Sequence, residues 1–110
     1  MPNILQGTTP SLKIKINDYY FKVSDVSELE LKVWQDNKAI DLTFGLSDVE
    51  SNPTQNSFKL SFTEEQTLQM HPSSNLRWQM RVKLQNGEIL GTRISEPISV
   101  LALKSEERLS

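Results

Sequence analysis

Apolar and polar residues alternate along several stretches of the chain, which is the period of a half-buried β-strand. The longest such stretch is "LRWQMRVKLQNGEILGTRI", residues 76–94. Its first half carries an apolar row made of Leu76, Trp78, Met80, Val82 and Leu84. The row between them consists of Arg77, Gln79, Arg81, Lys83 and Gln85. We expect the first row to face a core and the second to face water.

The same alternation predicts strands in "SLKIKIN", "SDVSELELKVWQ", "AIDLTFG", "SFKLSF" and "EPISVLAL". Their inward positions are expected to be Leu12, Ile14, Ile16, Leu29, Leu31, Val33, Ile40, Leu42, Phe44, Phe58, Leu60 and Phe62. "QDNKA" is typical of a turn, and the polar "SDVESNPTQN" of a loop with a short edge strand near Val49. Pro97 keeps the last strand at an edge or starts it at a break.

The loop length of the hairpin near Asn86-Gly87 decides which residues share a face. A two-residue loop would put Arg93 on the core face, which is costly without a partner. A three-residue loop, with Gly87 in a left-handed conformation, instead sets Val82 opposite Leu90, Met80 opposite Thr92 and Trp78 opposite Ile94. We therefore predict the longer loop, with Leu90 and Ile94 buried.

"FTEEQTLQM" breaks the period of two. Thr63 followed by Gln66 resembles a capping box, and Leu68 is a plausible anchor to the core. One short helix is expected near 63–70.

Six or seven short antiparallel strands without βαβ alternation indicate an all-β, immunoglobulin-like β-sandwich, with the helix crossing between the sheets. A small β-barrel is the alternative. The expected organisation is an N-terminal arm (1–10), a β-sandwich domain (11–103) and a charged C-terminal tail (104–110).

Composition excludes several classes of function. The chain has 110 residues, a net charge of −2 and no cysteine, so disulfides and thiolate metal sites are ruled out and no nucleic-acid partner is indicated. No apolar run is long enough to cross a membrane, and "MPNILQGTTP" does not resemble a secretory signal. We expect no membrane partner.

No group of residues has the pattern of an active site. His71 is the only histidine, and it precedes Pro72 in a predicted turn. Adjacent Glu64 and Glu65 suit a helix start better than acid–base chemistry. Asp48, Glu50 and Asn52 alternate as in a calcium loop but lack its glycine and its closing glutamate. We expect no enzyme activity, catalytic residue, metal, cofactor or small-molecule substrate.

The aromatic residues are the best candidates for partner contacts. Trp34 is out of phase with the inward row of its strand, so it faces outward or folds over the rim of the sandwich. In "NDYYFKV", at least one of Tyr19, Tyr20 and Phe21 should also point outward. Such aromatic faces can contact proteins or sugars. For the basic row of Arg77, Arg81 and Lys83, a solvated sheet face is the favoured interpretation, with the rim of a protein interface second.

The segments "QGTTPSLKIKI", "VSELELKVWQDNKAI", "NSFKLSFTEEQTLQM", "LRWQMRVKLQNGEILGTRI" and "ISVLAL" together resemble a family of small proteins encoded by phages and prophages of Gram-positive bacteria. The matching motifs are a Gly-Thr-Thr-Pro segment (residues 7–10), a turn with Thr63, Glu65, Thr67 and Leu68, a strand of the form "iQ-x-R-v" (78–82), and an Asn86-Gly87 turn. The long "SDVESNPTQN" loop departs from the pattern.

The resemblance implies a virion or virion-assembly role in the head, connector or tail, for a protein made in the host cytoplasm and located in the virion. Its partners would be other virion proteins or copies of itself, as an oligomer. The arm could add to a neighbour's sheet edge. The expected contact residues are Trp34, Tyr19, Tyr20, Gly7, Thr8 and Thr9. The alternatives are a carbohydrate or host-surface binding module and a phage-encoded regulator that binds a host protein.

Overall fold

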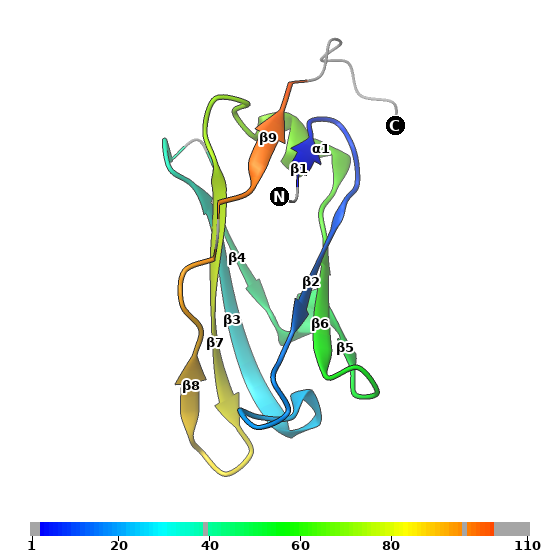
Figure 1. Ribbon diagram of the computed structural model, residues 1–110, viewed down its shortest axis with the longest axis vertical. Coiled ribbons are helices and arrows are strands. Elements are labelled where there is room, and N and C mark those ends of the chain that lie inside the picture. The colour runs from blue at the N-terminus through cyan, green and yellow to red at the C-terminus, as the bar shows by residue number, and fades with distance from the viewer. Residues whose placement is uncertain (1–2, 39, 96, 103–110) are drawn as a thin grey trace.

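The computed structural model describes residues 3–38, 40–95 and 97–102, and strands dominate it (Figure 1). Its elements are β1 (Asn3–Leu5), β2 (Ser11–Lys15), η1 (Val23–Asp25), β3 (Val26–Gln35), β4 (Asp41–Gly45), η2 (Leu46–Asp48), β5 (Val49–Asn52), β6 (Ser57–Ser61), α1 (Glu64–Gln69), β7 (Leu76–Leu84), β8 (Ile89–Gly91) and β9 (Ser99–Leu101). Strands make up 49% of the structure and helices 12%, which confirms the all-β prediction.

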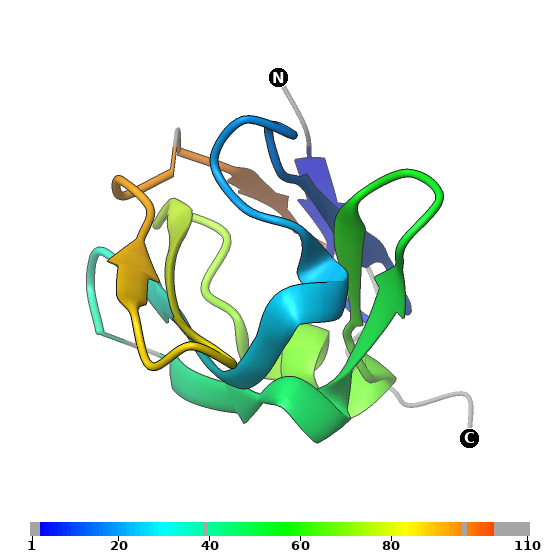
Figure 2. The ribbon, with the colours of Figure 1, turned by 90° about the horizontal axis from the view of Figure 1, so that it is seen from below.

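Two antiparallel sheets form the sandwich. One has the order β4-β3-β7-β8 and the other β2-β6-β5, while β1 and β9 form a separate parallel pair. Figure 2, viewed along the strands, shows β7 and β8 in one layer and β5 and β6 in the other. This order is immunoglobulin-like, and both sheets keep open edges, unlike the closed barrel that was the alternative. The helix α1 links β6 of one sheet to β7 of the other, as predicted.

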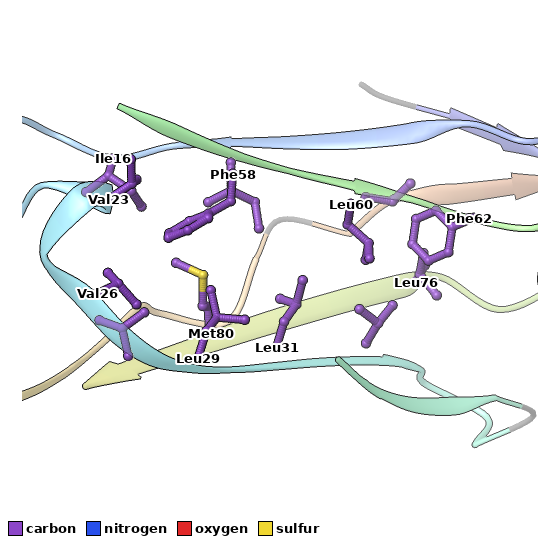
Figure 3. Close-up of a cluster of buried hydrophobic side chains, with 14 of the residues drawn as sticks. Ile16, Val23, Val26, Leu29, Leu31, Phe58, Leu60, Phe62, Leu76 and Met80 are labelled. Atoms are coloured by element: carbon purple, nitrogen blue, oxygen red, sulfur yellow. The ribbon is translucent and has the colours of Figure 1, made fainter. Parts of the chain in front are cut away.

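The core lies between the sheets and is built from the predicted inward rows (Figure 3). Phe58, Leu60 and Phe62 extend from the β6 side toward Leu31 and Met80 of the facing sheet. Leu42, Phe44 and Leu12 are only half-buried and pack against this cluster. Burying one large apolar side chain is worth about 1.5–3 kcal/mol, so the alternation of these strands supplies most of the drive to form two layers.

The β7–β8 hairpin has the predicted three-residue loop. Leu84 N donates to Glu88 O (2.8 Å), Gly87 has φ +91°, and Val82 lies opposite Leu90.

The expected burial of Ile94 is wrong, because this side chain is 54% exposed. Beyond Gly91, the Thr92 and Ser95 hydroxyls accept from the backbone N–H of Met80 (3.0 Å) and Trp78 (2.9 Å). Ser95 N also donates to Trp78 O at 2.8 Å, so the partner of Trp78 is shifted by one residue and Ile94 turns outward. Leu90 and Trp78 are half-buried rather than enclosed.

The short helix begins with the predicted capping box. Gln66 N donates to Thr63 Oγ1 (3.1 Å) and Thr63 N donates to Gln66 Oε1 (2.9 Å). Leu68, the expected anchor, is only half-buried, whereas Thr67 is 0% and Met70 1% exposed. A helix of this length presents few residues to the core; within α1 the buried residues are Glu64 and Thr67, and Met70 is buried at the position just after the helix.

The N-terminal segment is part of the sandwich end rather than a free arm over the residues described. Asn3–Leu5 form β1, which the sequence did not predict, and Ile4 is 6% exposed. The N-terminal segment was expected to add to the sheet edge of a neighbouring molecule. Its strand β1 instead pairs in parallel with β9 of the same chain. The whole of the predicted C-terminal tail (104–110), and residue 103 before it, lie outside the described residues.

Candidate partner-binding surfaces

The outer face of the β4-β3-β7-β8 sheet carries cross-strand ion pairs. Arg81 lies 3.2 Å from Glu30, and Lys32 lies 3.8 Å from Asp41. Arg77 bonds Asp36 at the end of the sheet (2.8 Å). Exposed pairs of this kind contribute only about 0–1 kcal/mol each, so their main effect is to neutralise the basic row. Arg77 and Arg81 of the row are thus each paired with a carboxylate, which lowers the positive charge of this face.

Trp34 lies on this same outer face, as its phase in the strand predicted. It stands opposite Arg77 of β7 and Asp41 of β4 and is half-buried. It therefore offers less free ring surface than an isolated tryptophan on a sheet.

Tyr19 and Tyr20 lie in the loop between β2 and η1, at the end of the sandwich opposite the C-terminal end of β3 (Figure 1). Tyr19 is 99% exposed, so the prediction that one of these aromatics points outward is confirmed. Phe21 is buried, and its ring lies 5.2 Å from that of Tyr20. Val26 and Trp34 are separated by eight residue steps along β3, or about 26 Å at 3.3 Å per residue. Trp34 and the tyrosines therefore do not form one platform.

An exposed apolar group borders strand β8, and we call Tyr20, Ile89 and Ile94 the β8 surface. Ile89 is 62%, Ile94 54% and Tyr20 46% exposed. The Tyr20 hydroxyl donates to Gly91 O at 2.6 Å, which fixes the tyrosine against the strand. The sequence reasoning did not single out Ile89, although a three-residue loop already implies that it faces outward, opposite Lys83.

Strand β8 is also an edge of its sheet. Alternation of the antiparallel ladder turns the backbone N–H and C=O of Ile89 and Gly91 away from β7. Next to this edge, an open hollow of about 430 Å³ lies over the outer face, and Ile89, Gly91, Glu30 and Arg81 contribute to its lining. The edge thus combines backbone groups that face away from β7, of which the Gly91 carbonyl is bonded by Tyr20, with apolar side chains and the Arg81–Glu30 ion pair.

The Gly-Thr-Thr-Pro segment makes bonds within the chain. Gly7 adopts φ +74°, and the Thr8 carbonyl accepts from the buried Thr67 hydroxyl at 2.7 Å. Phe62 N donates to Pro10 O at 2.9 Å. Gly7 and Thr8 are half-buried, and Thr9 is exposed. A partner contact at these three residues stays a prediction.

The titratable residues considered for chemistry have local structural contacts. His71 is exposed and its Nδ1 lies 2.6 Å from the Ser73 hydroxyl. The Asp48 carboxylate accepts from Gly45 N–H at 2.8 Å. Within the described ranges, no three His, Asp or Glu side chains gather closely enough to hold a metal ion. Over the same ranges, no helix has the length and apolar character that crossing a membrane requires.

No protein-family model matches this chain, and no curated protein matches it.

Proposed function

We propose that this protein is a non-enzymatic structural or assembly component of a phage particle, in the head, connector or tail. It would act through contacts with other virion proteins or with copies of itself. The observation that best supports a contact role is the β8 surface, where Tyr20, Ile89 and Ile94 are each exposed in or beside a strand at the edge of its sheet. Exposed apolar and aromatic side chains beside an open strand edge are suited to contacts with another protein. The phage assignment rests on the sequence resemblance.

The form of the contact follows from the strand edge. The Gly91 carbonyl is already bonded by Tyr20, which limits how far a partner strand can extend the sheet along β8. A partner would therefore pack mainly on the side chains of Ile89 and Ile94. Tyr19, next to Tyr20 in the chain and 99% exposed, would add an aromatic contact at little conformational cost.

The first test is mass spectrometry of purified particles, and we expect the protein to be present in stoichiometric amounts. Its absence from particles would contradict the proposal.

A second test targets the surface itself. Ile89→Arg should lower particle yield or incorporation while leaving the unfolding midpoint within experimental error, because the side chain is already 62% exposed. Thr54→Arg, exposed in the β5–β6 turn, is the matched control and should assemble normally. Equal behaviour of the two variants would remove the β8 surface from the proposal.

The two alternatives have their own assays. A glycan array with wild type and Trp34→Ala tests sugar binding, which would have to use Trp34 and the tyrosines as separate sites. Retrieval of one specific host enzyme from host lysate, together with absence from particles, would favour the regulator.

A further inference from the structure

The outer face of the β2-β6-β5 sheet carries lysines that face one another. Lys13 of β2 lies directly opposite Lys59 of β6, and Lys15 follows on the same face of β2. Side chains at opposed positions of an antiparallel pair have Cβ atoms about 4.5–5.5 Å apart, and like charges there destabilise the sheet. Among the described residues, none of these three lysines belongs to an ion pair.

The contrast with the other sheet shows that this arrangement is not a general property of the surface. On the β4-β3-β7-β8 face, Arg81 and Lys32 each have a carboxylate across the strand, at 3.2 and 3.8 Å. On the β2-β6-β5 face, Glu50 of β5 lies opposite Lys59 in the register but makes no ion pair with it. On the other side of Lys59, the opposite residue on β2 is a second lysine, Lys13. The face therefore carries three lysines against the carboxylate of Glu50, an excess of positive charge although the whole chain is at −2.

Protection of a strand edge explains only part of this pattern. Lysines on an edge strand discourage pairing with other chains, which would account for Lys13 and Lys15 on β2. Edge protection does not account for Lys59, because β6 is the central strand of its sheet.

A hollow lies beside the facing lysines. It measures about 520 Å³, and its lining includes Lys13, Lys59, Asn52, Gln55 and also the acidic Glu50. The Lys13 ammonium donates to the Gln55 side-chain oxygen, a neutral partner that positions the lysine without cancelling its charge. The hollow thus offers a ligand two ammonium groups and several polar side chains, and the one carboxylate in its lining, Glu50, makes no ion pair with Lys59.

We propose that this hollow binds an acidic segment of a partner protein, with carboxylates placed between Lys13 and Lys59. Carboxylates fit better than nucleic acid because the lining contains no aromatic side chain for base stacking and no arginine fork for phosphate. The negative net charge of the chain also opposes a long polyanion more than a short acidic segment. The inference does not depend on where the protein acts.

The test uses the full-length chain and a fluorescein-labelled deca-glutamate peptide, titrated by fluorescence anisotropy at low salt, with a ten-nucleotide thymidine strand as comparator. Lys13→Gln and Lys59→Gln should each weaken peptide binding by about threefold to fivefold, as expected for one exposed charge pair. Lys83→Gln removes the same charge from the opposite sheet and should change binding by less than twofold.

Three binding results would overturn the proposal: no peptide binding, equal losses in Lys59→Gln and Lys83→Gln, or tighter binding of the DNA strand through the same lysines. Thermal unfolding gives an independent readout. Lys13→Gln should raise the unfolding midpoint because it relieves the facing charges, whereas Lys83→Gln, which lies opposite Glu28, should not. A lower midpoint for Lys13→Gln would assign Lys13 to the fold and contradict a binding role.

Discussion

Two buried amide side chains hold irregular backbone in place. Gln35 is 0% exposed, and it accepts from His71 N (2.7 Å) while donating to the carbonyls of His71 and Ser74 (2.8 and 2.9 Å). Asn56 is 4% exposed and in a left-handed conformation (φ 51°). Its amide donates to Ile16 O and Phe21 O and accepts from Val23 N, at 3.1, 2.9 and 2.8 Å. These bonds satisfy loop groups that burial would otherwise leave without partners.

Removing the Asn56 amide should therefore be costly. Asn56→Ala leaves three buried backbone groups without their partner and puts alanine in a left-handed conformation that asparagine tolerates better, so we expect a loss of about 2–4 kcal/mol in the free energy of unfolding. Asn56→Gly accepts the positive φ of this position without steric cost, so its loss of stability reports mainly the missing hydrogen bonds. Urea denaturation measures both. The control Asn52→Ala removes one exposed bond to Gln55 N (3.2 Å) and should cost less than about 0.5 kcal/mol. A similar cost at both sites would contradict the anchoring role.

At the scale of elements, the β7–β8 hairpin shows how one turn residue sets a surface. Gly87 allows the three-residue loop, and that loop places Ile89 outward and Leu90 inward. Gly87 and Gly91 lie close together in this hairpin but have different backbone requirements. Gly87 has a positive φ (+91°) with nothing near its missing β-carbon, whereas a β-carbon at Gly91 would meet Met80 O at an ordinary 3.6 Å.

The two glycines form a matched pair of tests. Gly87→Ala should destabilise the protein by about 1 kcal/mol, because an L-residue is disfavoured in the left-handed region. Gly91→Ala should stay within about 0.5 kcal/mol of wild type, since the space is available and the backbone is extended. Thermal and urea unfolding compare the two. If the two variants lose equal free energy of unfolding, the left-handed conformation of Gly87 is not the reason why the hairpin needs a glycine there.

At the scale of the molecule, the first and last described strands meet at one end of the sandwich. Strand β1 pairs in parallel with β9, and Gln6 N donates to Leu101 O at 3.1 Å (Figure 1). The following Gly-Thr-Thr-Pro segment is bonded to α1 and to Phe62. The N-terminal segment thus covers part of the core near α1, and its contribution to stability can be measured directly.

Ile4 and Leu5 test whether β1 belongs to the folded unit. Ile4→Ala should reduce the free energy of unfolding by about 2–4 kcal/mol, as is usual for an enclosed isoleucine. Leu5→Ala, on the outward side of the same strand and 38% exposed, should cost less than about 1 kcal/mol. Equal and small effects would show that β1 detaches without loss, and would restore the free-arm interpretation. Calorimetry or urea denaturation distinguishes these outcomes.

Local periodicity was sufficient to predict most of this fold. Rows such as Phe58, Leu60 and Phe62 identify an inward face without knowledge of the neighbouring strand, because successive side chains of any strand point to opposite sides. The capping box at Thr63 and the turn at Gly87 were likewise recognisable, since each depends on residues close together in the chain.

Strand neighbours decided the rest. The shift that exposes Ile94, the pairing of β1 with β9, and the facing of Lys13 with Lys59 all join segments whose spacing in the sequence carries no signal. Which segments lie side by side is set by how the two sheets pack over a shared core. That packing also determines which charged side chains form ion pairs and which do not. The alternation of residues thus establishes which side chains are buried, while the surfaces available for binding arise only from the assembled sandwich.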